Sequence, residues 1–199
     1  MNATSNILCV PNLQGERYNI DKVSYQSSWV DAKATLTEQV EAIRLAYRHE
    51  RILIGTSFGG LAAWQFGSQY QPSSLQGIVL VDVLPSMTRF PWWKKQALRV
   101  IPYLPPGLLQ PFYHVMRYRQ GLPPADVHVV MQRITSFRTA FPAYHFPVPT
   151  LVLSKNARFH QTWCDIAEQY PISAERHQHP AAQIEAWMST IDPRRTEPL

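Results

Sequence analysis

A serine between glycines is the residue whose setting in this chain points most clearly to chemistry. Ser57 stands in the stretch Gly55-Thr56-Ser57-Phe58-Gly59, after the apolar run Ile52–Ile54 and before an Ala/Leu/Trp-rich helical pattern. This order predicts a strand, a sharp turn and a helix, with the serine on the turn. A hydroxyl held there projects from the carboxyl edge of a sheet, where it can attack an acyl carbon once a base accepts its proton.

This stretch resembles the nucleophile elbow of the α/β-hydrolase superfamily, because it matches the pattern Gly-x-Ser-x-Gly in the required strand and helix context. The resemblance covers nearly the whole chain in order of elements and implies an α/β fold, a mostly parallel sheet with helices on both faces. It also implies an oxyanion hole, with one N–H from Phe58 and another from the loop after the first strand, near Asn12 and Leu13. An ordinary strand exit is the alternative for that loop.

The acid of the implied Ser-acid-His triad departs from the family pattern. The superfamily usually places an aspartate shortly after the strand that here is Leu151–Ser154, but this chain has Ala157 there. Two substitutes exist, Asp82 at the end of the strand after the elbow and Asp165, expected at the start of a later helix. Asp82 has the better predicted geometry, because the ends of parallel strands converge on one edge. A polar residue that merely completes the strand end is its alternative role.

The histidine of the triad lacks the usual Gly-His context. His177 and His179 follow the last predicted strand, and they would share one face if that strand continued through both. We therefore expect a turn after His177, and both histidines stay candidates beside a surface role; His160 is more remote. A zinc site built from His177, His179 and Asp82 is a weak alternative without a further spaced ligand, so we expect no metal and no cofactor.

Apolar periodicity predicts the elements that must position these residues. The predicted strands are 7–10, 22–25, 52–54, 77–83, 147–154 and 173–177, and the predicted helices are 36–48, 58–70, 162–170 and one whose apolar face is Ile184, Trp187, Met188 and Ile191. Strand 22–25 follows the first strand so closely that we expect a trimmed version of the fold.

Residues 85–146 interrupt the alternation of strands and helices. This proline- and tryptophan-rich segment contains short helical patterns such as Val127–Phe137, and its position resembles the lid that α/β hydrolases insert over the active site. Between Met87 and Phe146 there are eight basic residues and one acid, a net charge of +7, whereas the rest of the chain has 11 basic and 13 acidic residues, or −2. We expect a core of residues 1–84 and 147–199 with a basic helical lid, or an irregular helical layer without a substrate role.

Composition narrows the class of protein. A chain of 199 residues, 45% hydrophobic and 17% charged, suits one globular domain. It contains no stretch apolar enough to span a bilayer, no secretory signal at its start and no motif for nucleic-acid binding, which together favour a cytoplasmic protein. Cys9 and Cys164 are expected to be buried free thiols.

Two functional hypotheses follow. The first is a serine hydrolase that cleaves a carboxylic ester or thioester through an acyl-enzyme; its basic lid favours an anionic substrate or acidic partner, such as an acyl group on an acidic carrier protein or coenzyme A. This resembles the small esterases of the superfamily that act on carrier-bound acyl esters. The second is a protein on the same scaffold that has lost its proton relay and binds an acyl ligand or a protein partner without turning it over.

Overall fold

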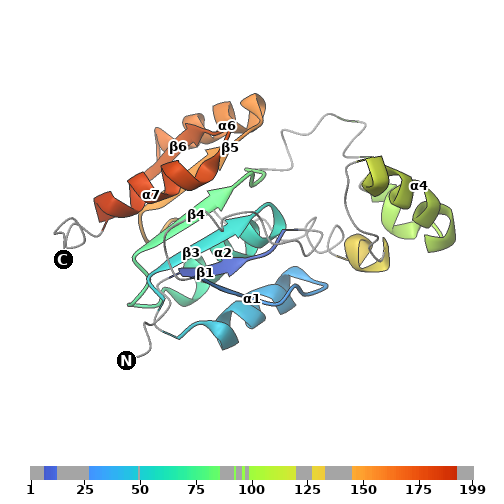
Figure 1. Cartoon of the computed structure of the whole chain (residues 1–199), viewed down its shortest axis with the longest axis horizontal. Coiled ribbons are helices and arrows are strands. Elements are labelled where there is room, and N and C mark those ends of the chain that lie inside the picture. Colours follow the sequence, from blue (N-terminus) through green and yellow to red (C-terminus); the bar gives the residue numbers. More distant parts are fainter. Residues whose placement is uncertain are drawn as a thin grey trace.

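The core of the molecule is a sheet of parallel strands with the order β2-β1-β3-β4-β5-β6 (Figure 1). The computed structural model describes residues 7–12, 27–48, 50–85, 92, 96, 99–119, 127–132 and 145–191. The strands are β1 (Ile7–Val10), β2 (Ser27–Trp29), β3 (Ile52–Thr56), β4 (Gly77–Val81), β5 (Thr150–Ser154) and β6 (Ile172–Arg176). All residues of β1, β3, β4 and β5 are buried, as expected for strands that are covered on both faces.

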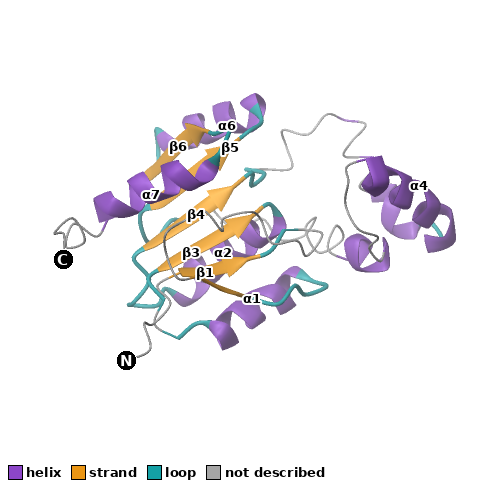
Figure 2. Ribbon diagram, viewed as in Figure 1, coloured by secondary structure: helices purple, strands orange, loops and turns teal. Residues whose placement is uncertain are grey.

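Helices cover both faces of this sheet (Figure 2). Side chains of α1 (Leu36–Ala46), α2 (Phe58–Tyr70) and α6 (Ala157–Ala167) share one apolar core with alternate residues of the strands, such as Leu53 and Leu80. The other residues of the same strands pack against α7 (Pro180–Ile191) on the opposite face. The predicted α/β class, a mostly parallel sheet with helices on both faces, is therefore confirmed.

Local signals explain where the helices begin. Thr35 and Glu38 form the capping box that their spacing predicts, with the Thr35 hydroxyl accepting from Glu38 N–H at 3.2 Å and the Glu38 carboxylate accepting from Thr35 N–H at 3.0 Å. The α2 helix is buried along most of its length, because it lies directly against β3 and β4. It ends at Gln71, a left-handed residue just before Pro72.

Several element predictions were wrong in their bounds; the strand predicted over 147–154, for example, begins at Thr150. The helix predicted over 162–170 begins instead at Ala157, because the Asn156 side chain accepts from the N–H groups of Arg158 and Phe159 and starts the helix five residues earlier. The strand predicted over 77–83 ends at Val81. The strand predicted over 22–25 lies outside the described residues, and the edge strand beside β1 is β2.

The segment 85–146 is described only in parts. They are Trp92, Gln96, residues 99–105 with the 3-10 turn η2 (Ile101–Tyr103), helix α4 (Pro106–Arg119) and a helical turn at 127–132, which corresponds to the start of the pattern predicted over 127–137. Figure 1 shows α4 beyond the carboxyl ends of the strands. The division into a core of 1–84 and 147–199 and a lid of 85–146 stays a prediction.

The chain is firmly attached to the core where it leaves this segment. The carbonyl of His145 accepts from Trp64 Nε1 at 3.0 Å and from Ser68 Oγ at 2.9 Å, and the ring of Phe146 stacks on Trp64 with their centroids 5.1 Å apart. This contact brings the chain back to α2 just before it enters β5.

None of the described helices is long and apolar enough to cross a membrane. The cytoplasmic location stays a prediction.

The close contact between α2 and the loop after β1 gives a test of this packing. A Cβ atom at Gly59 would lie 2.1 Å from the carbonyl oxygen of Pro11 and 2.6 Å from that of Val10, both backbone atoms that cannot move aside alone. We expect Gly59→Ala to lower the free energy of unfolding by about 1–3 kcal/mol, measured by urea denaturation, although alanine is normally the better helix residue.

Gly107 in α4 is the matched control, because a Cβ atom there meets nothing within 4 Å. Gly107→Ala should leave the free energy of unfolding unchanged or raise it slightly. Equal stability of the two variants would contradict the described packing of α2 against the loop after β1.

Candidate active site

Ser57 occupies the turn between β3 and α2, as its sequence context predicts. Its backbone has φ 52° and ψ −112°, a conformation that costs a non-glycine residue about 1–3 kcal/mol. The turn is held by a hydrogen bond from Ser57 N–H to the carbonyl of Val81 on β4 (2.8 Å) and by one from Leu61 N–H to the carbonyl of Ser57 (3.2 Å). Side chains are excluded around it, since a Cβ at Gly55 would lie 2.4 Å from the Cα of Gly60.

Asp82 lies in a second strained turn, at the end of the neighbouring strand β4. Its φ is also 52°, and among the described residues other than glycine only Ser57, Gln71 and Asp82 have a left-handed φ. Gln71 ends α2, where a left-handed residue is ordinary. The other two are the proposed nucleophile and the proposed acid. Backbone strain of this kind concentrates at functional sites, so it favours Asp82 as a functional residue over a mere strand end.

The carboxylate of Asp82 is held at the carboxyl edge of the sheet. The backbone N–H of Lys155, the first residue after β5, donates to Asp82 Oδ1 at 2.7 Å, and Asp82 N–H donates to the carbonyl of Leu153 at 2.8 Å. The indole of buried Trp163 donates to the carbonyl of the next residue, Val83, at 2.9 Å. Sequence reasoning missed Lys155 and Trp163, since the first acts through its backbone and the second lies 80 residues from its partner.

His177 directly follows β6 and approaches Asp82. Its Nε2 lies 3.3 Å from Asp82 Oδ1, and its side chain has no exposed surface, whereas the Asp82 side chain is 30% exposed. The distance is that of an ion pair, but the ring is not oriented for a hydrogen bond, and neither ring nitrogen has a hydrogen-bond partner. The pair is therefore an electrostatic contact and not a hydrogen bond.

Ser57 and His177 are not joined by a hydrogen bond, since both nitrogens of the buried ring lack a partner. The strand order explains the separation: β4 and β5 lie between β3 and β6. With neighbouring strands about 4.8 Å apart, the backbones at the two strand ends are about 14 Å apart. The structure thus brings together the predicted acid and one predicted histidine, next to the turn that holds the predicted nucleophile.

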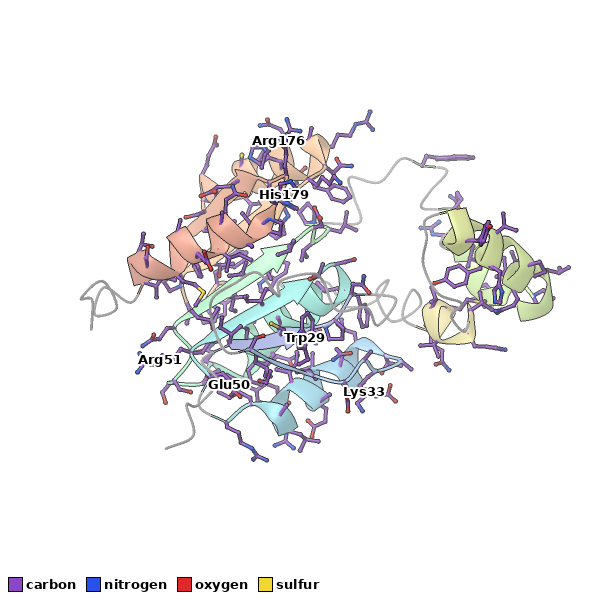
Figure 3. All side chains as sticks on the ribbon, in the orientation of Figure 1. Trp29, Lys33, Glu50, Arg51, Arg176 and His179 are labelled. Atoms are coloured by element: carbon purple, nitrogen blue, oxygen red, sulfur yellow. The ribbon has the colours of Figure 1, made fainter. Side chains whose placement is uncertain are left out.

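The remaining candidates lie elsewhere. The turn expected after His177 is present, and it leaves His179 exposed on the short connection to α7. Figure 3 shows His179 with Arg176 near the start of α7, away from Glu50 and Arg51 at the opposite end of the sheet. Asp165 does not begin a helix as predicted but lies within α6, where its Oδ1 accepts from Gln161 Nε2 at 3.2 Å. His160, also on α6, contacts the thiol of Cys164 instead, 3.6 Å from its Nε2.

The predicted oxyanion donors are described in part. Phe58 is the first residue of α2, so its backbone N–H has no acceptor within the helix and lies at the positive end of the helix dipole. Asn12 is partly buried after β1, and Leu13 lies outside the described residues. The loop after β1 does run beside the elbow, because Pro11 contacts Gly59. Oxyanion binding by these residues stays a prediction.

Neither a disulfide nor a metal cluster is found in the described part of the chain. Cys9 is buried and Cys164 partly buried, and neither forms a disulfide. Within the described ranges, no three histidine, cysteine, aspartate or glutamate side chains are grouped so that they could hold a metal ion. Two other polar atoms near the strand ends, Thr56 Oγ1 and Ser154 Oγ, are buried and, like the His177 nitrogens, have no hydrogen-bond partner.

Comparison with known families agrees with this geometry. The family model described as the alpha/beta hydrolase fold matches residues 17–120, which include Ser57 and Asp82. The chain belongs to the α/β-hydrolase family. The family match ends before β5, so the strand pair that carries Lys155 and His177 lies beyond it. No curated protein sequence matches the chain.

Solved structures share the fold at low sequence identity. The type II thioesterase BorB from the borrelidin biosynthetic cluster is 12% identical, with a TM-score of 0.57 over 94% of this chain and 90% of BorB. A lipase-esterase related protein from Clostridium acetobutylicum is 12% identical, with a TM-score of 0.64 over 94% of each chain. The bottromycin epimerase BotH is 11% identical, with a TM-score of 0.67 over 96% of this chain and 93% of BotH. The same fold therefore supports non-hydrolytic chemistry as well.

The difference in burial between the two histidines can be measured. We expect diethyl pyrocarbonate to modify exposed His179 rapidly and to modify His177 at least about tenfold more slowly. His177 is buried and must first become exposed by local opening. Peptide mass spectrometry gives both rates in one sample. The two rates should converge in urea, and equal rates in the native protein would contradict the burial of His177.

Proposed function

We propose that this α/β-hydrolase is a serine hydrolase that cleaves a carboxylic ester or thioester through an acyl-enzyme. The observation that carries the proposal is the strained turn at Ser57, next to the Asp82–His177 pair at the same edge of the sheet. The thioesterase and esterase-related structures of the same fold support this class of reaction.

In the proposed mechanism Ser57 Oγ attacks the acyl carbon while His177 accepts its proton. The carboxylate of Asp82 stabilises the imidazolium that forms, and the N–H of Phe58 donates to the developing oxyanion. The proton then passes to the leaving alcohol or thiol, and water releases the acyl group from Ser57 by the reverse sequence of proton transfers. Because Ser57 and His177 are not hydrogen bonded, the proposal requires the 177–179 turn to rearrange when substrate binds.

Covalent labelling tests the nucleophile directly. A fluorophosphonate probe should label Ser57 alone, and Ser57→Ala should abolish labelling.

His177→Gln should lower kcat by about a thousandfold or more, because it removes the proposed base. His179→Gln is the matched control: its side chain is exposed, so the rate should stay near that of the wild type. If His179→Gln lost activity and His177→Gln kept it, the base would be His179 and the proposed role of His177 would be wrong.

The acid has its own test. Asp82→Asn keeps an oxygen that can accept from Lys155 N–H but removes the charge that faces His177. We expect kcat for a p-nitrophenyl ester to fall by up to about 10⁴-fold with a nearly unchanged free energy of unfolding. A variant with full activity would show that Asp82 only completes the end of β4.

The basic segment favours an anionic leaving group, such as coenzyme A or an acidic carrier protein, because opposite charge speeds encounter and fixes orientation. Replacing Arg117, Arg119, Arg133 and Arg138 with glutamate should lower kcat/KM for a coenzyme A thioester far more than for a neutral p-nitrophenyl ester. Arg51→Glu, at the amino end of β3, is the control and should affect both substrates equally. Equal losses on both substrates in the fourfold variant would refute the charge preference.

A second candidate function is favoured by one observation, the missing hydrogen bond between Ser57 and His177. A chain that keeps the elbow without a closed relay would bind an acyl ligand or a partner and not turn it over. An unlabelled Ser57 in a protein that still binds a fatty acyl ligand, measured by calorimetry, would support this function over hydrolysis.

A further inference from the structure

Exposed apolar side chains are concentrated in one segment of the chain. Among the described residues, eight large hydrophobic side chains are exposed, and six of them fall between residues 92 and 118: Trp92, Val100, Tyr103, Leu108, Val115 and Tyr118. The other two are Leu45 and Tyr70 on α1 and α2. Scattered exposed apolar residues are normal on a protein surface, but a cluster of this kind marks a surface that binds something.

Three of these positions, together with Pro111, form a continuous stripe on α4. Leu108, Pro111, Val115 and Tyr118 are spaced by three, four and three residues, so they share one face of the helix. Leu108 is 70% exposed, Val115 is 53% and Tyr118 is 85% exposed, and Pro111 is exposed as well. We call these four residues the α4 stripe.

The α4 stripe is not the face that α4 uses for packing within the chain. Gln110 Oε1 accepts from the N–H of Val127 at 3.2 Å, so that side of α4 meets the helical turn at 127–132. Val127, Val130 and Met131 of this turn are buried. The apolar side chains of the turn are therefore already covered, while those of the stripe are not.

The charge of this part of the sequence limits what can cover the stripe. The segment from Met87 to Phe146 carries a net charge of +7, and α4 itself contains Arg117 and Arg119 but no acidic residue. A second copy of the chain would bring an equally basic surface against this one, and the repulsion opposes self-association. The occupant of the surface must therefore be anionic as well as apolar.

We propose that the α4 stripe docks on an anionic lipid bilayer. A helix that is apolar on one face, contains two arginines and no acidic residue, and is preceded by exposed aromatic residues is suited to lie in the plane of the membrane interface. Trp92 and Tyr103 are 74% and 82% exposed and belong to chain segments outside α4. A bilayer can accept such separate side chains without a matching shape, whereas a folded acidic protein would need one.

Docking in this way would bring the lipid to the functional edge of the sheet. Figure 1 shows α4 beyond the carboxyl ends of the strands, the edge where Ser57, Asp82 and His177 lie. The proposal does not depend on hydrolysis, because the stripe contains none of the candidate catalytic residues. Ser57→Ala should bind vesicles as the wild type does, so failure of the docking proposal and failure of the hydrolase proposal can be told apart.

Vesicle co-sedimentation of the full chain tests the proposal. We expect binding to vesicles of phosphatidylcholine mixed with phosphatidylglycerol, weaker binding to pure phosphatidylcholine, and release of the protein as salt is raised. Leu108→Asp should reduce the affinity by about tenfold or more, because it removes one inserted apolar side chain and adds a charge that the anionic surface repels.

Leu45→Asp is the matched control, since Leu45 is 60% exposed, close to the 70% of Leu108, but lies on α1. It introduces the same charge change and should leave vesicle binding almost intact. Equal losses in the two variants, or equal binding to neutral and anionic vesicles, would overturn the proposal. It would also be overturned if the wild type bound no vesicles but bound an acidic carrier protein through Leu108, or formed a dimer that Leu108→Asp dissociates.

Discussion

The whole site depends on one steric constraint, the close approach of α2 to the ends of β1 and β3. The turn at Ser57 can be this tight because Gly55, Gly59 and Gly60 have no side chains that would fill the space. The helix then begins immediately, so Ser57 is its N-cap residue and directly precedes the N–H groups that have no acceptor within α2. The buried strands and the largely buried α2 supply the rigid support that keeps a strained residue in place.

The shortness of the connection after β5 favours Asp82, which follows β4, as the candidate acid. Only Lys155 and Asn156 separate β5 from α6, and Asn156 is already used to cap that helix. A loop of this length has no room for an extra carboxylate at the edge of the sheet. The backbone N–H of Lys155 instead points to Asp82, so the carboxylate from the neighbouring strand occupies the space in front of β5.

The sequence predicted what depends on local pattern, and failed where distant parts of the chain decide. Continuous apolar runs identified β1, β3, β4 and β5, and the glycines around Ser57 identified the elbow. The choice between His177 and His179 stayed open because it rests on burial, which the turn after β6 determines. The separation of His177 from Ser57 follows from the strand order, a non-local property that no periodicity records. The start of α6 depends on the cap that Asn156 provides, which apolar periodicity does not record.

The imidazole of His177 is difficult to explain by stability alone. Each buried polar group without a hydrogen bond costs about 1–3 kcal/mol, and both nitrogens of this ring lack one. An apolar side chain of similar size at the end of β6 would avoid that cost. A functional imidazole, in contrast, needs free nitrogens: one faces a carboxylate, and the other must be available to accept a proton from the reacting group. Asp82 Oδ1 already lies 3.3 Å from His177 Nε2, so the two residues have the features of a proton-transfer pair that lacks its third member. The hydroxyl of Ser57, on its strained turn at the same edge of the sheet, is the group that suits that role.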